Sequence, residues 1–343
     1  MNHVFTGIPG KYCKYPGILV KYIYMKIHIP NSAFLGNIDP FLRNFDTSNP
    51  EVLEITANKQ WISIHPMVIS MIAALGLSLE LKSIKCETME ARSKHYLKRM
   101  GLFDFLKVDS GIEIIEHEPA GRFIPLQKIT NSEKLTKFIT DVVPLLHLEP
   151  KHAEPIRYIL SELMRNVFEH AESEIGVIMC AQYYKKSNTI RIGIVDRGVG
   201  IQKTISSLHR AKTNIEAIRL ALTPGITGTT KRIGGTDYNA GAGLFFIKSI
   251  ATVNKDFFVI YSGKGMFKLL KASSEKGIRL HGDPFKDKHS KGEDFPYWQG
   301  TAVGIDINLD STEEFSLLLN HIRQSYSKAV KEQRKVYYKA KFI

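Results

Sequence analysis

The segment SELMRNVFEHA, residues 161–171, restricts the possible folds most, because it requires one helix to satisfy two different surroundings. Apolar residues at helical spacing predict one buried face, formed by Leu160, Leu163, Met164 and Val167. Glu162, Asn166 and His170 recur every fourth residue, so they form a row along another face. A carboxylate, an amide and an imidazole in one row indicate either a solvated face or the wall of a polar site. The helix alone leaves both interpretations open.

A second motif, VDRGVGI, follows a predicted hairpin. The strand-like segments IGVIMCAQYY and TIRIGIVD flank KKSN, a turn sequence. Asp196 then stands at the end of the second strand, with Gly198 and Gly200 after it. A carboxylate at a strand end can accept a hydrogen bond from an exocyclic amine, and glycines let a backbone approach a flat ligand. By itself this motif is a weak signal, because an ordinary β-turn has the same residues.

A third motif, GGTDYNAGAGLFFIKSI, brings Gly241 and Gly243 to the start of an apolar helix. Free backbone N–H groups and the positive end of a helix dipole at such a start suit a phosphate chain. The motif is neither a Walker P-loop, because no GK[ST] follows, nor a dinucleotide fingerprint, because no strand immediately precedes the glycines.

Together and in this order, the motifs resemble the GHKL ATP-binding domain. That superfamily includes DNA gyrase B subunits, MutL, Hsp90, the catalytic domains of histidine kinases and the anti-sigma-factor serine kinases. The resemblance covers about residues 150–310 and includes the closing strand with its Gly-Thr step, QGTAVGI. It implies an α/β (α+β) fold with a Bergerat-type two-layer sandwich, and ATP and Mg²⁺ as ligands.

The resemblance also implies roles for individual residues. Asn166 would ligate Mg²⁺, and Glu162 would orient or deprotonate the attacking water, as catalytic residue. Asp196 would accept a hydrogen bond from the adenine amino group, with Thr301 near the adenine. The remaining predicted nucleotide contacts are His170, Gly198, Gly200, Thr227, Lys231, Gly241, Gly243 and Leu244. For His170, the alternative to a contact with phosphate is a structural role. The predicted ATP lid covers about 223–240, and its cations either neutralise phosphate charge or are simply solvated.

The N-terminal part alternates strand-like and helical segments and predicts a small α/β domain. Its order of elements is similar to the STAS fold of anti-sigma antagonists, but no phospho-acceptor serine stands clearly in the expected loop. An unrelated α/β cap is the alternative. We therefore predict a STAS-like domain at 1–125, the ATP-binding domain at 126–310, and a basic helix or tail at 311–343. Within the second domain, a helix is expected at 131–147 and a loop at 281–300.

Bulk properties limit the location and the partners. No apolar run reaches the roughly 20 residues that span a bilayer, no secretory signal pattern opens the sequence, and the three cysteines form no metal or disulfide pattern. These observations predict a cytoplasmic protein without membrane contact, and the resemblance to the GHKL domain implies a bacterial one. The net charge is +13, and residues 323–341 contain seven basic side chains against Glu332 alone. Such a segment indicates either a solvated helix or an anionic partner.

Two functions from different classes remain open at this point. The first is an enzyme, either a slow ATPase or a Ser/Thr protein kinase that acts on a partner protein. The second is a non-catalytic switch, in which nucleotide orders the lid and changes which partner is bound. We do not expect a histidine autokinase, because no acceptor helix hairpin is recognisable before the ATP domain, or a DNA gate, because about 30 residues follow residue 310. A homodimer is compatible with the resemblance, and nucleic-acid binding by the basic helix is a third possibility.

Overall fold

A computed structural model defines the fold. It describes residues 12–15, 18–21, 24–44, 52–58, 62–77, 84–86, 91–112, 123–142, 150–234, 241–271, 279–310 and 315–339. Helices and strands alternate, so the mixed α/β class expected from the sequence is confirmed. In the described part of the chain, every helix is too short or too polar to span a membrane.

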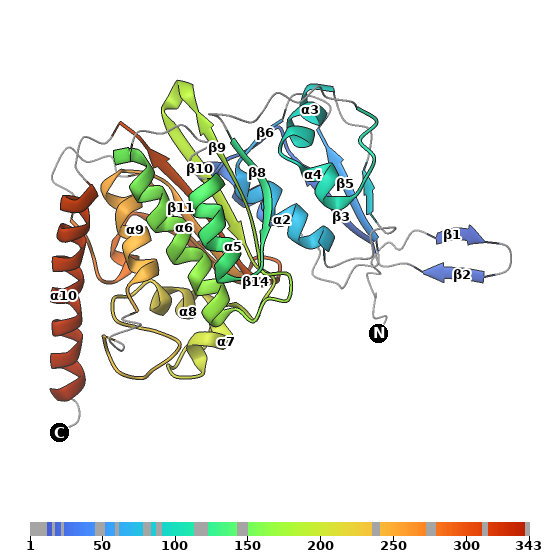
Figure 1. The fold of residues 1–343 in the computed structure, drawn as a ribbon. Helices are drawn as coiled ribbons and strands as arrows, with labels where there is room; N and C mark the ends of the chain where they lie inside the picture. The colour runs from blue at the N-terminus through green and yellow to red at the C-terminus, as the bar shows by residue number, and fades with distance from the viewer. Residues whose placement is uncertain are drawn as a thin grey trace, which may run out of the picture.

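A seven-stranded antiparallel sheet forms the centre of the fold (Figure 1). Its order is β13-β12-β11-β14-β10-β9-β8. The strands are β8 (Phe123–Ile129), β9 (Val177–Tyr184), β10 (Thr189–Val195), β11 (Phe258–Gly263), β12 (Gly265–Leu269), β13 (His289–Gly292) and β14 (Trp298–Asn308). The predicted hairpin joins β9 to β10, and Asn188 closes its turn with φ +42°. The predicted boundary between residues 125 and 126 lies within β8, and the division into domains stays a prediction.

Helices cover one face of this sheet. Side chains of alternate strand residues, such as Ile190, Ile192 and Ile194 of β10, join a buried cluster with the apolar stripe of α6. The helices of this half are α5 (Ser132–Lys137), α6 (Pro150–His170), α7 (Gly200–Ser206), α8 (Asn214–Ala221), α9 (Gly243–Val253) and α10 (Phe315–Lys339). The stripe predicted from 160–167 is therefore buried, which fixes the orientation of the polar row of α6.

The N-terminal part covers the opposite face of the sheet. Its helix α2 (Pro66–Leu77) is apolar on all sides and buried from residue 66 to 76, and it packs on β9, β10 and β14. Three parallel strands, in the order β3-β5-β7, lie beyond it. The other elements are β1 (Tyr12–Tyr15), β2 (Ile18–Lys21), β3 (Tyr24–Ile29), β4 (Ser32–Ala33), α1 (Asp39–Leu42), β5 (Val52–Ala57), β6 (Ser63–Ile64), β7 (Ile84–Cys86), α3 (Ala91–Arg99) and α4 (Leu102–Leu106).

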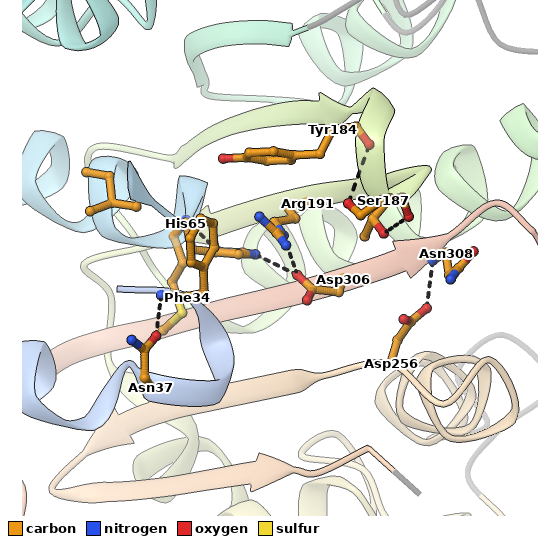
Figure 2. Close-up of polar contacts among 12 residues, drawn as sticks. Phe34, Asn37, His65, Tyr184, Ser187, Arg191, Asp256, Asp306 and Asn308 are labelled. Atoms are coloured by element: carbon orange, nitrogen blue, oxygen red, sulfur yellow. Dashed lines mark hydrogen bonds and ion pairs between the residues drawn. The ribbon is translucent and has the colours of Figure 1, made fainter. Parts of the chain in front are cut away.

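A buried polar network joins these two parts (Figure 2). The Nε2–H of His65 donates to Asp306 Oδ1 over 3.2 Å, while Nδ1 accepts from the N–H of Met67 at the start of α2. Burial lowers the pKa of His65, so the neutral ring is favoured. Arg191 lies 3.5 Å from the same carboxylate, with its guanidinium over the rings of Phe34 and Tyr184. The charge of Asp306 is thus compensated where α2 meets the sheet.

Two sequence predictions need correction. Residues 281–300 are more than a loop, because they contain a short helical turn at Pro284–Lys286, the strand β13 and the start of β14. As an edge strand with polar side chains, β13 pairs through its backbone and lacks the apolar alternation that sequence reasoning needs. The helix predicted at 131–147 is α helical only to Lys137 and continues as a wider π turn at Phe138–Val142. Residues 143–149 lie outside the described residues.

Candidate functional site

A cavity of about 300 Å³ opens beside the polar row of α6. Its walls come from α6, the end of β10, α7, the loop at 226–228, the start of α9, and the strands β11 and β14. Segments that are far apart in the sequence, including all three motifs, therefore meet here. Ten of the twelve predicted site residues line the cavity: Glu162, Asn166, His170, Asp196, Gly200, Thr227, Gly241, Gly243, Leu244 and Thr301.

Gly198 and Lys231 are the two that do not line the cavity. A Cβ at Gly198 would lie 1.9 Å from the carbonyl oxygen of Ala171, so this glycine allows the loop after β10 to pack against the end of α6. The N–H of Val199 donates to the same oxygen over 2.7 Å. Lys231 is exposed on the loop that precedes α9. Part of the predicted lid, 235–240, lies outside the described residues.

The Glu162 carboxylate is held by a neighbouring cation. Its Oε1 accepts from Arg165 Nη2 over 2.5 Å, and Arg165 also lies 3.7 Å from Glu169. Partial burial raises the pKa of Glu162, while Arg165 acts against that rise. The ring of His170 lies next along the helix, with Nε2 3.7 Å from Glu169 Oε2. Arg165 therefore bridges Glu162 and Glu169 along the cavity wall.

Asn166 lies one turn after Glu162 and has an unused hydrogen-bonding group. Its Nδ2 is buried without a hydrogen-bond partner among the described residues. Such an unpaired donor is rare in folded proteins, and it can donate to an acceptor group of a ligand in the cavity. Gly243 faces it at the start of α9, where an added Cβ would lie 2.5 Å from Glu162 Oε2 and 3.6 Å from Asn166 Nδ2. The glycine thus keeps space open beside both polar groups.

The start of α9 forms another wall of the cavity. Its N-cap residue, Ala242, supplies no side-chain hydrogen bond, so the first N–H groups of the helix lack a side-chain partner from that residue. Gly241 precedes it with φ +64°, and a Cβ there would lie 2.4 Å from the carbonyl oxygen of Ile226. This close approach brings the loop at 226–228 against the helix start, where an anion would be favoured.

Asp196 is buried and lines the cavity where β10 ends. Its Oδ1 accepts from the N–H of Gly198 over 2.8 Å, and its own N–H donates to the carbonyl of Thr301 over 2.9 Å. The positive φ of Gly300, +91°, lets that residue pass close to the Asp196 carbonyl. Burial raises the pKa of Asp196 to about 7, although the Gly198 N–H favours its charged form. A raised pKa in a cavity is typical of a functional carboxyl group.

This pKa gives a test in solution. Between about pH 4 and 7 the folded chain keeps a proton on Asp196 that the unfolded chain has lost, so this group lowers the free energy of unfolding as pH rises. We compare the free energy of unfolding of Asp196→Asn with that of wild type. This difference should shift in favour of the variant by on the order of 4 kcal/mol between pH 4 and pH 8. Urea unfolding across that range measures the difference. Burial also raises the pKa of Asp256 to about 7, but its contribution to the pH dependence is the same in both proteins and cancels.

The exposed Asp109→Asn variant controls for the removal of a surface carboxylate. A constant difference between Asp196→Asn and wild type across the range would contradict a protonated, buried Asp196.

Sequence reasoning missed several residues of the cavity. Tyr158 is the clearest, because it lies four residues before Glu162 and extends the same row by one turn. Its ring lies beside Phe246 and Phe315, at 6.3 and 6.0 Å between ring centroids. The spacing was visible in the sequence, but a tyrosine also fits an apolar stripe. Arg165 is the second, and as a neighbour in sequence of Asn166 it gave no periodic signal.

Metal binding by side chains alone has little support. Across the described ranges, no three carboxylate, imidazole or thiol groups gather where they could hold an ion.

Comparisons with known proteins assign no family: no family model and no curated protein matches the chain.

Proposed function

We propose that this chain binds Mg–ATP in the cavity beside α6, and that it hydrolyses ATP slowly or transfers its terminal phosphate to a partner protein. The observation that carries the proposal is the meeting of three separate sequence motifs around the unpaired amide of Asn166. The cavity volume is at the lower end of the range for small-molecule sites.

The residues present fit such a ligand. Asn166 would hold Mg²⁺ through its amide oxygen, because hard cations prefer oxygen ligands, and its Nδ2 would then donate to an anion. When bound, the ion would neutralise phosphate charge. Gly241, Gly243 and the first turn of α9 would bind phosphate oxygens through N–H groups. Asp196, deprotonated, would accept from the adenine amine, and Glu162 would take a proton from the attacking water or hydroxyl.

We also propose the finer fold assignments. In favour of a Bergerat-type sandwich, α6, the β9–β10 hairpin, α9 and the strands β11, β12 and β14 follow one another in the expected order. In favour of a STAS-like N-terminal part, parallel strands alternate with α2 and α3. A protein partner, dimerisation and a cytoplasmic location stay predictions from the sequence.

One observation favours the second candidate, a nucleotide-gated switch without catalysis. The carboxylate that should take the proton is already paired with Arg165 at 2.5 Å, and this pairing opposes the rise in pKa that burial gives Glu162. If that pair persists with nucleotide bound, ATP would be held without turnover.

Glu162→Gln separates the two candidates, because it keeps the size of the side chain and removes the base. For an ATPase, we expect ATP affinity within about threefold of wild type and turnover at least 100-fold lower, in the range typical of a lost general base. Calorimetry and phosphate release measure both quantities on one preparation. Glu154→Gln, an exposed change on the same helix, is the matched control.

Binding without turnover in wild type and in both variants, alone or with candidate partners, would identify the switch. Absence of ATP binding by the wild type would refute both candidates.

A further inference from the structure

The C-terminal helix α10 has one apolar face and one basic face. The apolar face packs on the fold through Leu318, Ile322 and Val330, and Tyr326 lies 6.0 Å from Phe246 between ring centroids. The opposite face is exposed over about four turns and forms the α10 stripe, which consists of Asn320, Arg323, Gln324, Ser327, Lys328, Lys331, Glu332 and Lys335. Figure 1 shows α10 at the edge of the fold, beside α9.

The α10 stripe has a net positive charge. Four cations stand against Glu332, and among the described residues none of the four forms an ion pair with a carboxylate. Amides and a hydroxyl fill the positions between them. The apolar side of α10 fixes the helix on the protein, so the cations are presented on a rigid element and little order has to be gained on binding.

The chemistry of the α10 stripe selects its partner. A membrane surface would require a row of apolar side chains beside the cations, and among the described side chains of α10 Leu317 is the single large apolar one that is exposed, before the first cation of the stripe. Single-stranded nucleic acid would require exposed aromatic rings for stacking, and the α10 stripe has none. A convex helix with Lys and Arg for phosphates and Asn and Gln for base edges matches a duplex groove, which admits one helix.

The inner side of the same helix contacts the loop that leads to the cavity. Arg334 Nε donates to the carbonyl of Ile233 over 2.9 Å. Val330 packs on Gly225 and Gly234, where a Cβ would approach its methyl groups to 2.9 and 3.2 Å. The N–H of Gly225 in turn donates to the carbonyl of Gly241, a residue of the cavity wall, over 3.1 Å. A short chain of contacts therefore joins α10 to the candidate nucleotide site.

We propose that the α10 stripe binds the backbone of duplex nucleic acid, and that binding there and in the cavity influence each other through Arg334 and Val330. The second part rests on the proposed function, whereas the first part does not. Phosphate contacts by four cations release bound counterions, so the affinity falls as salt rises.

The first experiment measures the anisotropy of a labelled 20-base-pair DNA duplex at several salt concentrations. For four contacts, affinity should fall on the order of 100-fold between 50 and 200 mM salt. The triple variant of Lys328, Lys331 and Lys335 to Gln should lower the salt slope by about 3. A control triple variant, of exposed Lys185, Lys186 and Lys264 to Gln, makes the same change in net charge on the sheet hairpins and should bind like wild type.

Three results would overturn the first part. The first is no duplex binding at 50 mM salt, and the second is an equal loss of duplex affinity in the two triple variants. The third is binding that depends on the stripe but is tighter for single-stranded DNA or poly-glutamate than for the duplex. Equal losses would show that the overall charge of +13, and not the α10 stripe, attracts the DNA.

The second experiment repeats the duplex titration with saturating Mg–ATP. In wild type, we expect the duplex affinity to change by at least about fivefold, and in Arg334→Gln that change should disappear while duplex binding without ATP persists. ATP binding is measured separately on both proteins. Bound ATP without any effect on duplex affinity would refute the coupling alone. Absence of ATP binding would refute the proposed function and the coupling together, and would leave the duplex result standing.

Discussion

Replacement of Asn166 by alanine should abolish the contribution of magnesium to ATP binding. In calorimetric titrations, wild type should bind Mg–ATP at least 100-fold more tightly than ATP in EDTA, and Asn166→Ala should bind both equally weakly. The reason is the small number of alternative ligands. In the parts of the chain that the structure describes, no cluster of carboxylate, imidazole or thiol groups could take over the ion. A hard cation that is bound by this amide and by phosphates would lose the amide oxygen in the variant.

The same variant separates function from folding. The Nδ2 of Asn166 is buried without a hydrogen-bond partner, so its removal leaves no partner unpaired and releases a group that is costly to bury. We therefore expect the unfolding midpoint of Asn166→Ala to equal or exceed that of wild type, as is common when a binding residue is not optimised for stability. Asn320→Ala, an exposed change on α10, controls for loss of an amide.

Mg–ATP affinity equal to wild type would remove Asn166 from the site. A lower midpoint together with lost binding would instead indicate that the amide supports the fold, because in that case folding and binding would be impaired by the same change.

The residues of the cavity could be predicted from the sequence where a period or a glycine marked them. Glu162, Asn166 and His170 share one wall because they stand four residues apart on α6, and burial of the apolar stripe at 160–167 turns that row toward the cavity. Asp196 could be placed because a strand ends before it. Gly198 shows the limit of such reasoning, because its sequence context fits a pocket floor, whereas its position is required by contact with Ala171.

The arrangement of the N-terminal part could not be predicted in the same way. An apolar run such as 66–77 identifies a buried helix, but periodicity does not say what buries it. The covering surface is the second face of the large sheet, and it becomes visible only through partners distant in sequence, such as His65 with Asp306 and Ser70 with Gly193. Burial on both faces also explains why β9 reads as VIMCA, a continuous apolar run, in an antiparallel sheet.

Gly193 is the point at which this packing is tightest. It pairs with Gly304 across β10 and β14, and the two glycines leave a flat patch in the sheet. The start of α2 lies directly on this patch: a Cβ at Gly193 would be 2.1 Å from the N atom and 2.3 Å from the Cα of Met67. These are backbone atoms, so no change of side-chain rotamer can relieve the contact. The helix would have to move away from the sheet.

We therefore expect Gly193→Ala to lower the free energy of unfolding by about 3 kcal/mol or more, at the upper end of overpacking effects, although alanine disrupts neither the strand nor its hydrogen bonds. Movement of α2 would also strain the contact between the Met67 N–H and His65, and with it the network around Asp306. Urea unfolding measures the loss.

In Gly282→Ala, the closest atom to the new methyl group is the Cβ of Ala329 at 3.1 Å, so this control should remain within about 1 kcal/mol of wild type. Unchanged stability in Gly193→Ala would mean that α2 does not rest on the sheet at this position. The cavity lies on the opposite face of the sheet, so Gly193→Ala protein that remains folded should still bind Mg–ATP, which distinguishes a packing defect from damage to the site.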